Sequence, residues 1–258
     1  MLLNAKHALV FTATGVIGSG VARRFAQEGA TVWISGRHPD ALEELEAAIR
    51  AAGGTAHAEV VDATDPEAVD AYIGRVAEAA GKLDVVFNAI GGRPVDLGYP
   101  QPSTTQDLAA FMLPLQIVLG SQFLTSRAAA SHMARTGGGA VVTLSATLSG
   151  MTAPFMAGIS AACGAVEAMT RSLAGEFVRA GVRVNCVRGS GMPETRTIQE
   201  TGAGLVALTG ELPSMALPPL GRLISIEDTA KAAAFLASDH ASGMTGQVVT
   251  VCGGVFVG

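Results

Sequence analysis

The sequence of 258 residues predicts a single domain with an open, doubly wound α/β fold. Short β-rich runs alternate with longer helical stretches along the whole chain. The short runs are apolar at consecutive positions, a pattern typical of parallel strands that helices cover on both faces. No linker or internal repeat interrupts this alternation. We therefore expect one domain over residues 1–258, with a nucleotide-binding half over about 1–100 and a substrate half with a lid over about 101–258.

About seven strands are expected in this sheet. The first run, at 7–11 (H-A-L-V-F), is apolar throughout, and the second, at 31–35 (T-V-W-I-S), is rich in residues that favour strands. Further runs of the same kind predict strands at 56–61, 83–88, 140–144, 182–187 and 247–251. In open parallel sheets ligands bind beyond the carboxyl ends of the strands, so the residues that follow each run are the candidates for a binding site.

Helices are expected between the strands, at 17–28, 40–52, 66–80, 105–135, 154–180 and 226–238. Gly29 ends the first of these helices, and the second has an acidic first turn and is followed by two glycines. The stretch 189–221, rich in Gly, Pro, Leu and Met, is predicted to be irregular. An irregular segment of that length is typical of a lid or a binding loop.

The composition excludes several classes of protein. Apolar residues make up 49 % of the chain and charged residues only 15 %, which excludes a disordered protein. The net charge of −5 does not suit nucleic-acid binding, which needs a basic face. Neither a membrane-spanning helix nor a signal peptide is expected. Three cysteines without metal-ligand spacing predict a reduced cytoplasmic protein with no metal site.

A glycine turn follows the first predicted strand, in the segment Thr12-Ala13-Thr14-Gly15-Val16-Ile17-Gly18. Gly15 lets the backbone approach a pyrophosphate, and Gly18 permits close packing of the helix on the strand. The helix that starts near Ile17 presents free N–H groups and the positive end of its dipole to a phosphate. This turn, with Thr12 at its start, predicts a dinucleotide-binding site.

The ends of the next three strands suggest the rest of the cofactor site. No acidic residue follows the second strand, where Arg37 can bind a 2′-phosphate and so favours NADP(H) over NAD(H). Asp62, with Ala63 beside it, is a candidate acceptor for the adenine amino group, and Asn88 and Ala89 are candidates to line the cofactor. The alternatives are a surface arginine for Arg37 and ordinary turn chemistry for the others.

Several blocks of sequence resemble the short-chain dehydrogenase/reductase family over nearly the full length of the chain. These blocks are L-D-V-V-F-N-A-I-G at 83–91, A-V-E-A-M-T-R-S-L-A at 165–174, G-V-R-V-N-C-V at 181–187, A-F-L-A-S-D at 234–239 and M-T-G-Q at 244–247. The resemblance implies a single Rossmann-type domain, NAD(P) as cofactor, and a homodimer or homotetramer packed through long helices. The glycine turn resembles the T-G-x-x-G-x-x-G form of the family's extended members, with Phe11-Thr12 in place of the leading Thr-Gly.

The catalytic half departs from the family pattern, which is Tyr-x-x-x-Lys preceded by a serine and a helical asparagine. Ile159 stands in the tyrosine position, Cys163 in the lysine position and Ala146 in the serine position, with Ser145 one residue before it. The tyrosine of the enoyl-reductase branch is spaced differently, and Met156 stands in its position. The chain has no tyrosine between residues 100 and 258, so the usual general acid is expected to be absent.

A few polar residues remain as candidates near an apolar pocket. Tyr99 follows the fourth strand, Ser145 is a candidate hydrogen-bond donor to substrate, and Arg188 can clamp an anionic substrate group or a cofactor phosphate. The alternatives are a packing aromatic for Tyr99, a satisfied strand-end hydroxyl for Ser145 and a surface salt bridge for Arg188. Cys163 is not expected to be a nucleophile, because no histidine or lysine lies near it in sequence. The predicted apolar lining consists of Met156, Ile159, Met192, Leu205, Met215 and Leu217.

The sequence thus favours an NADP(H)-binding oxidoreductase that acts on an apolar small molecule without the usual proton relay. Two alternatives stay open: a non-redox enzyme on the same scaffold, such as a cyclase, isomerase or dehydratase, and a catalytically silent binding or partner subunit.

Overall fold

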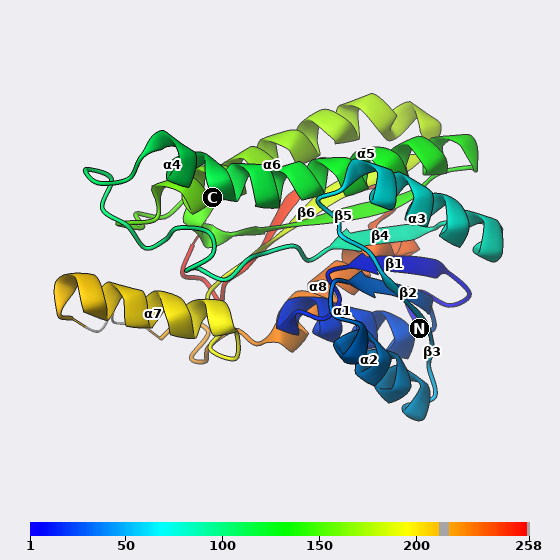
Figure 1. Ribbon diagram of the computed structural model, residues 1–258. Coiled ribbons are helices and arrows are strands. Elements are labelled where there is room, and N and C mark those ends of the chain that lie inside the picture. The colour runs from blue at the N-terminus through cyan, green and yellow to red at the C-terminus, as the bar shows by residue number, and fades with distance from the viewer. Residues whose placement is uncertain (212–216, 257–258) are drawn as a thin grey trace.

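The computed structural model describes residues 1–211 and 217–256, and in these residues seven strands form one parallel sheet (Figure 1). The strand order is β3-β2-β1-β4-β5-β6-β7, so the order reverses between β1 and β4. The predicted doubly wound fold is confirmed. The strands are β1 His7–Phe11, β2 Thr31–Gly36, β3 Thr55–Val60, β4 Val85–Asn88, β5 Gly139–Ala146, β6 Val182–Gly189 and β7 Val248–Val251.

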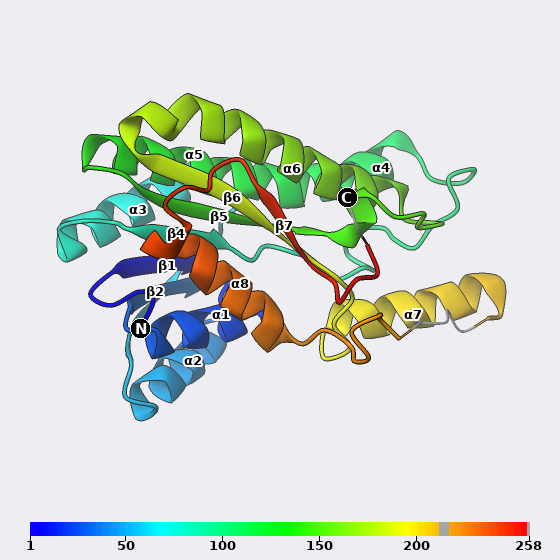
Figure 2. The same cartoon turned by 180° about the vertical axis from the view of Figure 1, so that it is seen from behind.

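Helices cover both faces of the sheet, as Figures 1 and 2 show from opposite sides. One face carries α1 Val16–Gln27, α2 Pro39–Ala51 and α8 Ile226–Ala237. The other carries α3 Pro66–Ala80, α5 Gly120–Arg135 and α6 Ala157–Phe177. A short helix α4, Leu108–Pro114, leads through a π-helical turn at Leu115–Leu119 into α5. Single 3₁₀ turns lie at Thr147–Ser149, Val178–Ala180 and Asp239–Ala241.

The apolar runs of the strands fill two cores, one on each side of the sheet. In β1, Ala8 and Val10 belong to the core beneath α1, α2 and α8, whereas Leu9 and Phe11 belong to the core beneath α3 and α5. All four side chains are fully buried. Because neighbouring residues of a strand face opposite sides, both must be apolar, which is the pattern that predicted the parallel sheet.

Polar caps begin four of the helices. The carboxylate of Asp65 accepts hydrogen bonds from two backbone N–H groups of the first turn of α3, and the carboxylate of Asp107 accepts one, from Ala110, at the start of α4. Ser225 begins α8 with a capping box, in which its hydroxyl and the carboxylate of Asp228 each accept a backbone N–H. Thr195 caps α7, Arg196–Thr209, with its side-chain oxygen. These caps satisfy N–H groups that a helix leaves without partners.

The prediction that 189–221 is irregular was wrong, because α7 lies within it. The helix lies beyond the carboxyl ends of the strands, apart from the two helical layers (Figure 1). Glycines at 202 and 204 weaken its helical signal in the sequence. Gly204 has a packing reason: a Cβ atom there would lie 2.7 Å from the Cδ of Pro100. Met215, predicted to line the pocket, lies outside the described residues.

One described helix, Leu108–Arg135, is long and apolar enough to cross a membrane by length and composition, with a mean hydropathy of 1.6. In the structure it is a core helix that packs on the sheet. Its polar residues Ser121, Gln122 and Thr125 are buried and hydrogen-bond to groups of the core. The polar inward face therefore belongs to the fold of this domain.

Candidate active site

The glycine turn after β1 is tightly folded. Thr12 takes a left-handed backbone conformation, with φ of 57°, and its carbonyl oxygen accepts a hydrogen bond of 3.2 Å from the N–H of Gly15. At Gly18 a Cβ atom would lie 2.4 Å from the oxygen of Thr12, so only glycine fits there. The turn brings the start of α1 directly against the end of β1.

The N-terminus of α1 is open to a ligand. Gly15 is its N-cap, and no side chain caps this helix, in contrast to α3, α4, α7 and α8. Among the described residues, a Cβ atom at Gly15 would meet only the oxygen of Thr12 within 4 Å, at 3.5 Å, so there is room beside the turn. Ile17 packs on the core, which directs the first turn of the helix. Uncapped N–H groups beside a glycine that leaves room fit a pyrophosphate.

Arg37 and Asp62 lie close together at the ends of β2 and β3. Arg37 is exposed, and within the described part of the chain no hydrogen bond or ion pair holds its guanidinium. Two donors of Thr64, the backbone N–H at 2.9 Å and the hydroxyl at 2.7 Å, bind one carboxylate oxygen of Asp62. These hydrogen bonds, together with the charge of Arg37, hold the pKa of Asp62 below its ordinary value despite partial burial. Asp62 is therefore an ionised acceptor beside a free cation.

The polar side chain of Asn88 bonds to the protein backbone and to Thr125, so it is not available to a cofactor. The amide nitrogen of Asn88 donates to the Ser121 carbonyl at 3.1 Å and to the Thr125 hydroxyl at 2.7 Å, and its side-chain oxygen accepts the N–H of Ile90. Asn88 is 1 % exposed, and Ala63 and Ala89 are also buried. Within the described chain, this asparagine thus fixes the loop after β4, and a cofactor would meet the backbone at this point.

The two family positions on α6 lie in an apolar cluster. Ile159 and Cys163 are 7 % and 5 % exposed and belong to one cluster with Met156, Val118 and Tyr99. Burial raises the pKa of Cys163 to about 11, so this cysteine stays a neutral thiol. At these two positions the cluster therefore presents a hydrocarbon side chain and a neutral thiol.

A buried ion pair lies next to this cluster. Arg188 on β6 binds Glu167 on α6 through two hydrogen bonds, from Nε to Oε1 at 2.8 Å and from Nη2 to Oε2 at 2.6 Å. The hydroxyls of Ser145 and Ser149 also donate to Oε1, at 2.8 and 2.6 Å. The ring of Phe256 lies 4.8 Å from the guanidinium carbon of Arg188. Ser145 and Arg188, which are register partners on β5 and β6, are thus joined through one carboxylate.

The sequence interpretation missed Glu167. Its signal was the helical spacing, because residues 159, 163 and 167 are four apart and so lie on one face of α6. Burial alone would raise the pKa of Glu167, but the hydrogen bonds from Arg188, Ser149 and Ser145 outweigh it and lower the pKa below its ordinary value. Glu167 is therefore ionised, and it holds both the Ser145 hydroxyl and Arg188 in place.

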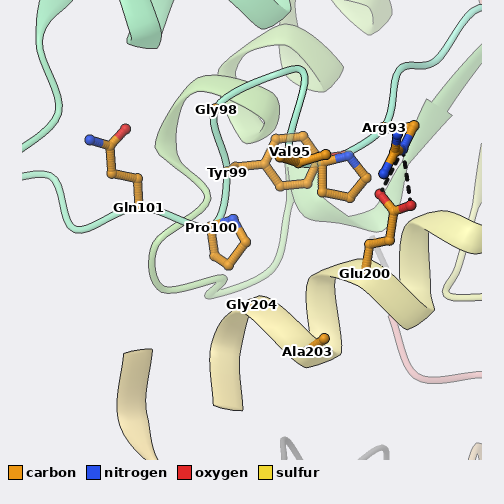
Figure 3. Close-up of a pocket in the computed structure, with 10 residues that line it drawn as sticks. Arg93, Val95, Gly98, Tyr99, Pro100, Gln101, Glu200, Ala203 and Gly204 are labelled. Carbon is orange, nitrogen blue, oxygen red and sulfur yellow. Dashed lines mark hydrogen bonds and ion pairs between the residues drawn. The ribbon is translucent and has the colours of Figure 1, made fainter. Parts of the chain in front are cut away.

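A pocket of about 540 Å³ opens between the loop after β4 and α7 (Figure 3). Residues 93–95 and 98–101 line one side, and Glu200, Ala203 and Gly204 of α7 line the other. Across it, the Nε of Arg93 donates to both carboxylate oxygens of Glu200, at 3.0 and 3.4 Å. Tyr99 is a wall residue of this pocket and a member of the apolar cluster on α6. The pocket therefore adjoins the cluster that contains Ile159 and Cys163.

The other predicted pocket residues are separated by the structure. Leu205 of α7 packs against the cluster that contains Met156 and Ile159, whereas Leu217 is exposed. The sulfur of Met192 accepts a hydrogen bond of 3.5 Å from the Thr229 hydroxyl, which places Met192 against α8. The structure brings Met156, Ile159, Leu205 and Tyr99 together and does not bring Met192 into their cluster.

An open glycine turn at the point where the strand order reverses defines a dinucleotide-binding protein of the Rossmann type. Within that class, the chain belongs to the short-chain dehydrogenase/reductase family. The family model described as enoyl-(acyl carrier protein) reductase matches residues 13–256. Membership makes the protein an oxidoreductase of the kind that uses NAD(P)(H).

Similar proteins cover almost the whole chain. The 7alpha-hydroxysteroid dehydrogenase of Clostridium sardiniense is 32 % identical over 99 % of this chain and 95 % of its own length. The cis-4-hydroxycyclohexanecarboxylate dehydrogenase of Sinomonas cyclohexanicum is 34 % identical over 96 % of this chain and 95 % of its own. A solved 7 alpha-hydroxysteroid dehydrogenase complexed with NADH and 7-oxo glycochenodeoxycholic acid superposes with a TM-score of 0.86. It is 27 % identical and covers 98 % of this chain, which covers 94 % of it.

Proposed function

We propose that the protein is an NADP(H)-dependent oxidoreductase that acts on a mainly apolar cyclic alcohol or ketone without a Tyr–Lys proton relay. The observation that carries the cofactor preference is Arg37, an exposed guanidinium free of protein partners in the described chain, at the strand end where a 2′-phosphate would lie. The glycine turn and the uncapped start of α1 support binding of the pyrophosphate. Asp62 supports recognition of the adenine.

The substrate class rests on the apolar cluster and on the relatives. A dinucleotide, when bound, supplies or accepts hydride. Ile159 and Cys163 exclude water from the reacting region; Ile159 has no acidic proton, and its raised pKa makes the protonated Cys163 thiol a weak acid at neutral pH. The proton must therefore come from water, from the substrate or from another side chain near the pocket. Cyclic alcohols and hydroxysteroids, the substrates named for two relatives, suit a pocket with mainly hydrocarbon walls.

Ser145 and Arg188 have roles in this proposal that follow from their hydrogen bonds. The single hydroxyl proton of Ser145 goes to Glu167, so Ser145 faces a ligand as an acceptor. The Nε and Nη2 donors of Arg188 bind Glu167, and its Nη1 donates to the Thr250 hydroxyl at 3.3 Å. We assign to Arg188 a positioning role for Glu167 and Ser145, rather than direct contact with an anionic group.

Titration of NADPH and NADH into the protein by calorimetry tests the cofactor assignment. NADPH should bind more tightly than NADH, and Arg37→Gln should weaken NADPH binding about 10- to 100-fold, because a charged hydrogen bond to phosphate is lost. The same substitution should leave NADH binding unchanged, because NADH has no 2′-phosphate. The control is Arg179→Gln, an exposed arginine in the turn before β6, at the opposite edge of the sheet. Absence of binding of either dinucleotide at millimolar concentration would contradict the proposal.

Turnover separates the proposed enzyme from the alternatives. With NADPH and a panel of cyclic ketones, loss of NADPH absorbance should show reduction; dinucleotide binding without turnover would favour a silent partner subunit, and conversion without redox change a non-redox enzyme. The double variant Ile159→Tyr with Cys163→Lys restores the family pair, and it should raise the rate of ketone reduction. A folded double variant with no gain would show that the cofactor geometry differs.

We propose a cytoplasmic protein, since all three cysteines are buried and unpaired. We also propose a homodimer or homotetramer.

A further inference from the structure

The hydroxyl of Tyr99 is a hydrogen-bond donor that the fold leaves without a partner. Tyr99 is 93 % buried, with 7 % of its surface exposed, on the loop between β4 and α4. Among the described residues, no hydrogen bond satisfies its hydroxyl. The hydroxyl oxygen is not one of the described side-chain atoms that are both buried and without a partner, so part of its surface is accessible to solvent. Because Tyr99 lines the pocket, its hydroxyl is available to donate a hydrogen bond to a ligand there.

Tyr99 stands at the boundary between the pocket and the apolar cluster of α6. Its ring lies among the residues that line the 540 Å³ pocket, beside Val95 in the view of Figure 3. It also belongs to the cluster that contains Ile159 and Cys163. A ligand that enters between the loop and α7 therefore meets the tyrosine next to the two family positions on α6. Pockets of this size typically hold one small molecule.

Three other polar side chains of the pocket have partners within the chain. Arg93 and Glu200 form an ion pair, so their opposite charges offset one another at the pocket wall. The side-chain amide of Gln101 donates to the Thr105 carbonyl at 3.3 Å. Pro94, Val95, Pro100, Ala203 and Gly204 supply the apolar lining. The pocket thus offers the Tyr99 hydroxyl as a neutral donor within mainly hydrocarbon walls.

The hydroxyl remains a donor over the whole physiological pH range. Burial, together with the nearby Cys163 and Glu200, raises the pKa of Tyr99 above its ordinary value. A protonated phenol donates one hydrogen bond to a carbonyl or hydroxyl oxygen. An anionic oxygen is not required, and the paired charges of Arg93 and Glu200 add no net attraction for one.

We propose that Tyr99 binds the oxygen of an uncharged, compact and mainly apolar ligand in this pocket, and that it is the specificity-determining donor of the substrate site. That this ligand is the substrate of the enzyme rests on the proposed function. It extends the proposed function by naming the residue, the atom and the ligand class: a neutral alicyclic ketone or alcohol with a single oxygen near Tyr99.

Matched ligands test the proposal without added dinucleotide. Adamantanone and methyleneadamantane are rigid and nearly equal in shape, and only the ketone has an oxygen acceptor. Calorimetry on the full chain should show about 3- to 10-fold tighter binding of the ketone, the range expected for one net hydrogen bond. In Tyr99→Phe the two ligands should bind equally, since the ring is kept and only the hydroxyl is removed.

Tyr72→Phe is the matched control, because Tyr72 is the other tyrosine of the chain and is buried in the core beneath α3. It should keep the preference for the ketone, and circular dichroism should show both variants folded. An unchanged ketone preference in Tyr99→Phe, or failure of the ketone to bind the unmodified protein, would overturn the assignment. Failure of NADPH to bind would contradict the proposed function, whereas the role of Tyr99 in ligand binding would still be decided by the ketone preference. In turnover, Tyr99→Phe should raise KM for the ketone more than it lowers kcat.

Discussion

At the scale of single residues, Thr12 adopts an unfavourable left-handed backbone conformation in the glycine turn. Its φ of 57° is costly for a β-branched residue, by about 1–2 kcal/mol. We predict that Thr12→Gly raises the free energy of unfolding by about 0.5–1 kcal/mol, since part of the gain is lost to the more flexible unfolded chain. NADPH should bind at least as tightly, because the turn keeps its shape. Urea unfolding and calorimetry measure the two effects.

Two variants separate backbone strain from the loss of the threonine side chain. Thr12→Ala keeps a Cβ atom and should bring little gain in stability. Ala5→Gly relieves a similar φ of 58° in the loop before β1, so it should stabilise the protein without any effect on NADPH binding. Destabilisation by Thr12→Gly would show that the threonine side chain contributes more to the turn than its strain costs.

At the scale of elements, the pair Glu167–Arg188 joins α6 to β6 through a buried carboxylate. Their side chains are 6 % and 10 % exposed. We predict that Glu167→Leu lowers the free energy of unfolding by about 3–5 kcal/mol, because Arg188 is left as a buried charge without its carboxylate. The double variant Glu167→Leu with Arg188→Met should recover most of this loss. The exposed pair Arg127–Asp70 is the control, and Arg127→Ala should cost only about 0–1 kcal/mol.

The same pair predicts a dependence of stability on pH. The pKa of folded Glu167 lies below its ordinary value of 4.5, so its contribution is present in full above that pH and is lost as the pH falls through the folded value. The double variant should therefore lose less stability on acidification than the unmodified protein. Urea unfolding between neutral pH and the acid range checks this; equal slopes in the two proteins would contradict it.

The elements also show what the sequence could and could not predict. The strands were predictable because strand residues point alternately into the cores on the two sides of the sheet. Consecutive apolar residues such as Leu9 and Val10 therefore indicate a sheet that is covered on both faces. The start of α1 was predictable because only glycine fits at position 18, where any side chain would clash with the backbone of Thr12. α7 was not, since Gly202 and Gly204 weaken its helical signal, and Gly204 is there because a side chain would clash with Pro100. Glu167 was missed because an isolated charge on a helix usually indicates a solvated face, and its partner on β6 is distant in sequence.

At the scale of the whole molecule, we expect the long helix Leu108–Arg135 and α6 to take part in self-association. The apolar stretch within Leu108–Arg135 is only 28 % buried. On α6, the small residues at 161, 164, 165 and 168 are partly or fully accessible, and a Cβ atom at Gly164 would meet nothing within 4 Å. Small residues let a second helix approach closely, and an apolar surface of this kind commonly forms a symmetric interface.

We predict that the protein elutes as a homodimer or homotetramer of its 26.1 kDa chain in size-exclusion chromatography with light scattering. Gly164→Arg should shift it towards the monomer, because the long charged side chain fits the free surface but not a close helix contact. Gly74→Arg on α3 is the matched control, since that glycine also has open space around it and lies on a different helix. Arginine favours helix more than glycine, so both variants should keep their helices. A monomeric unmodified protein, or an assembly that survives Gly164→Arg, would show that these helices face solvent.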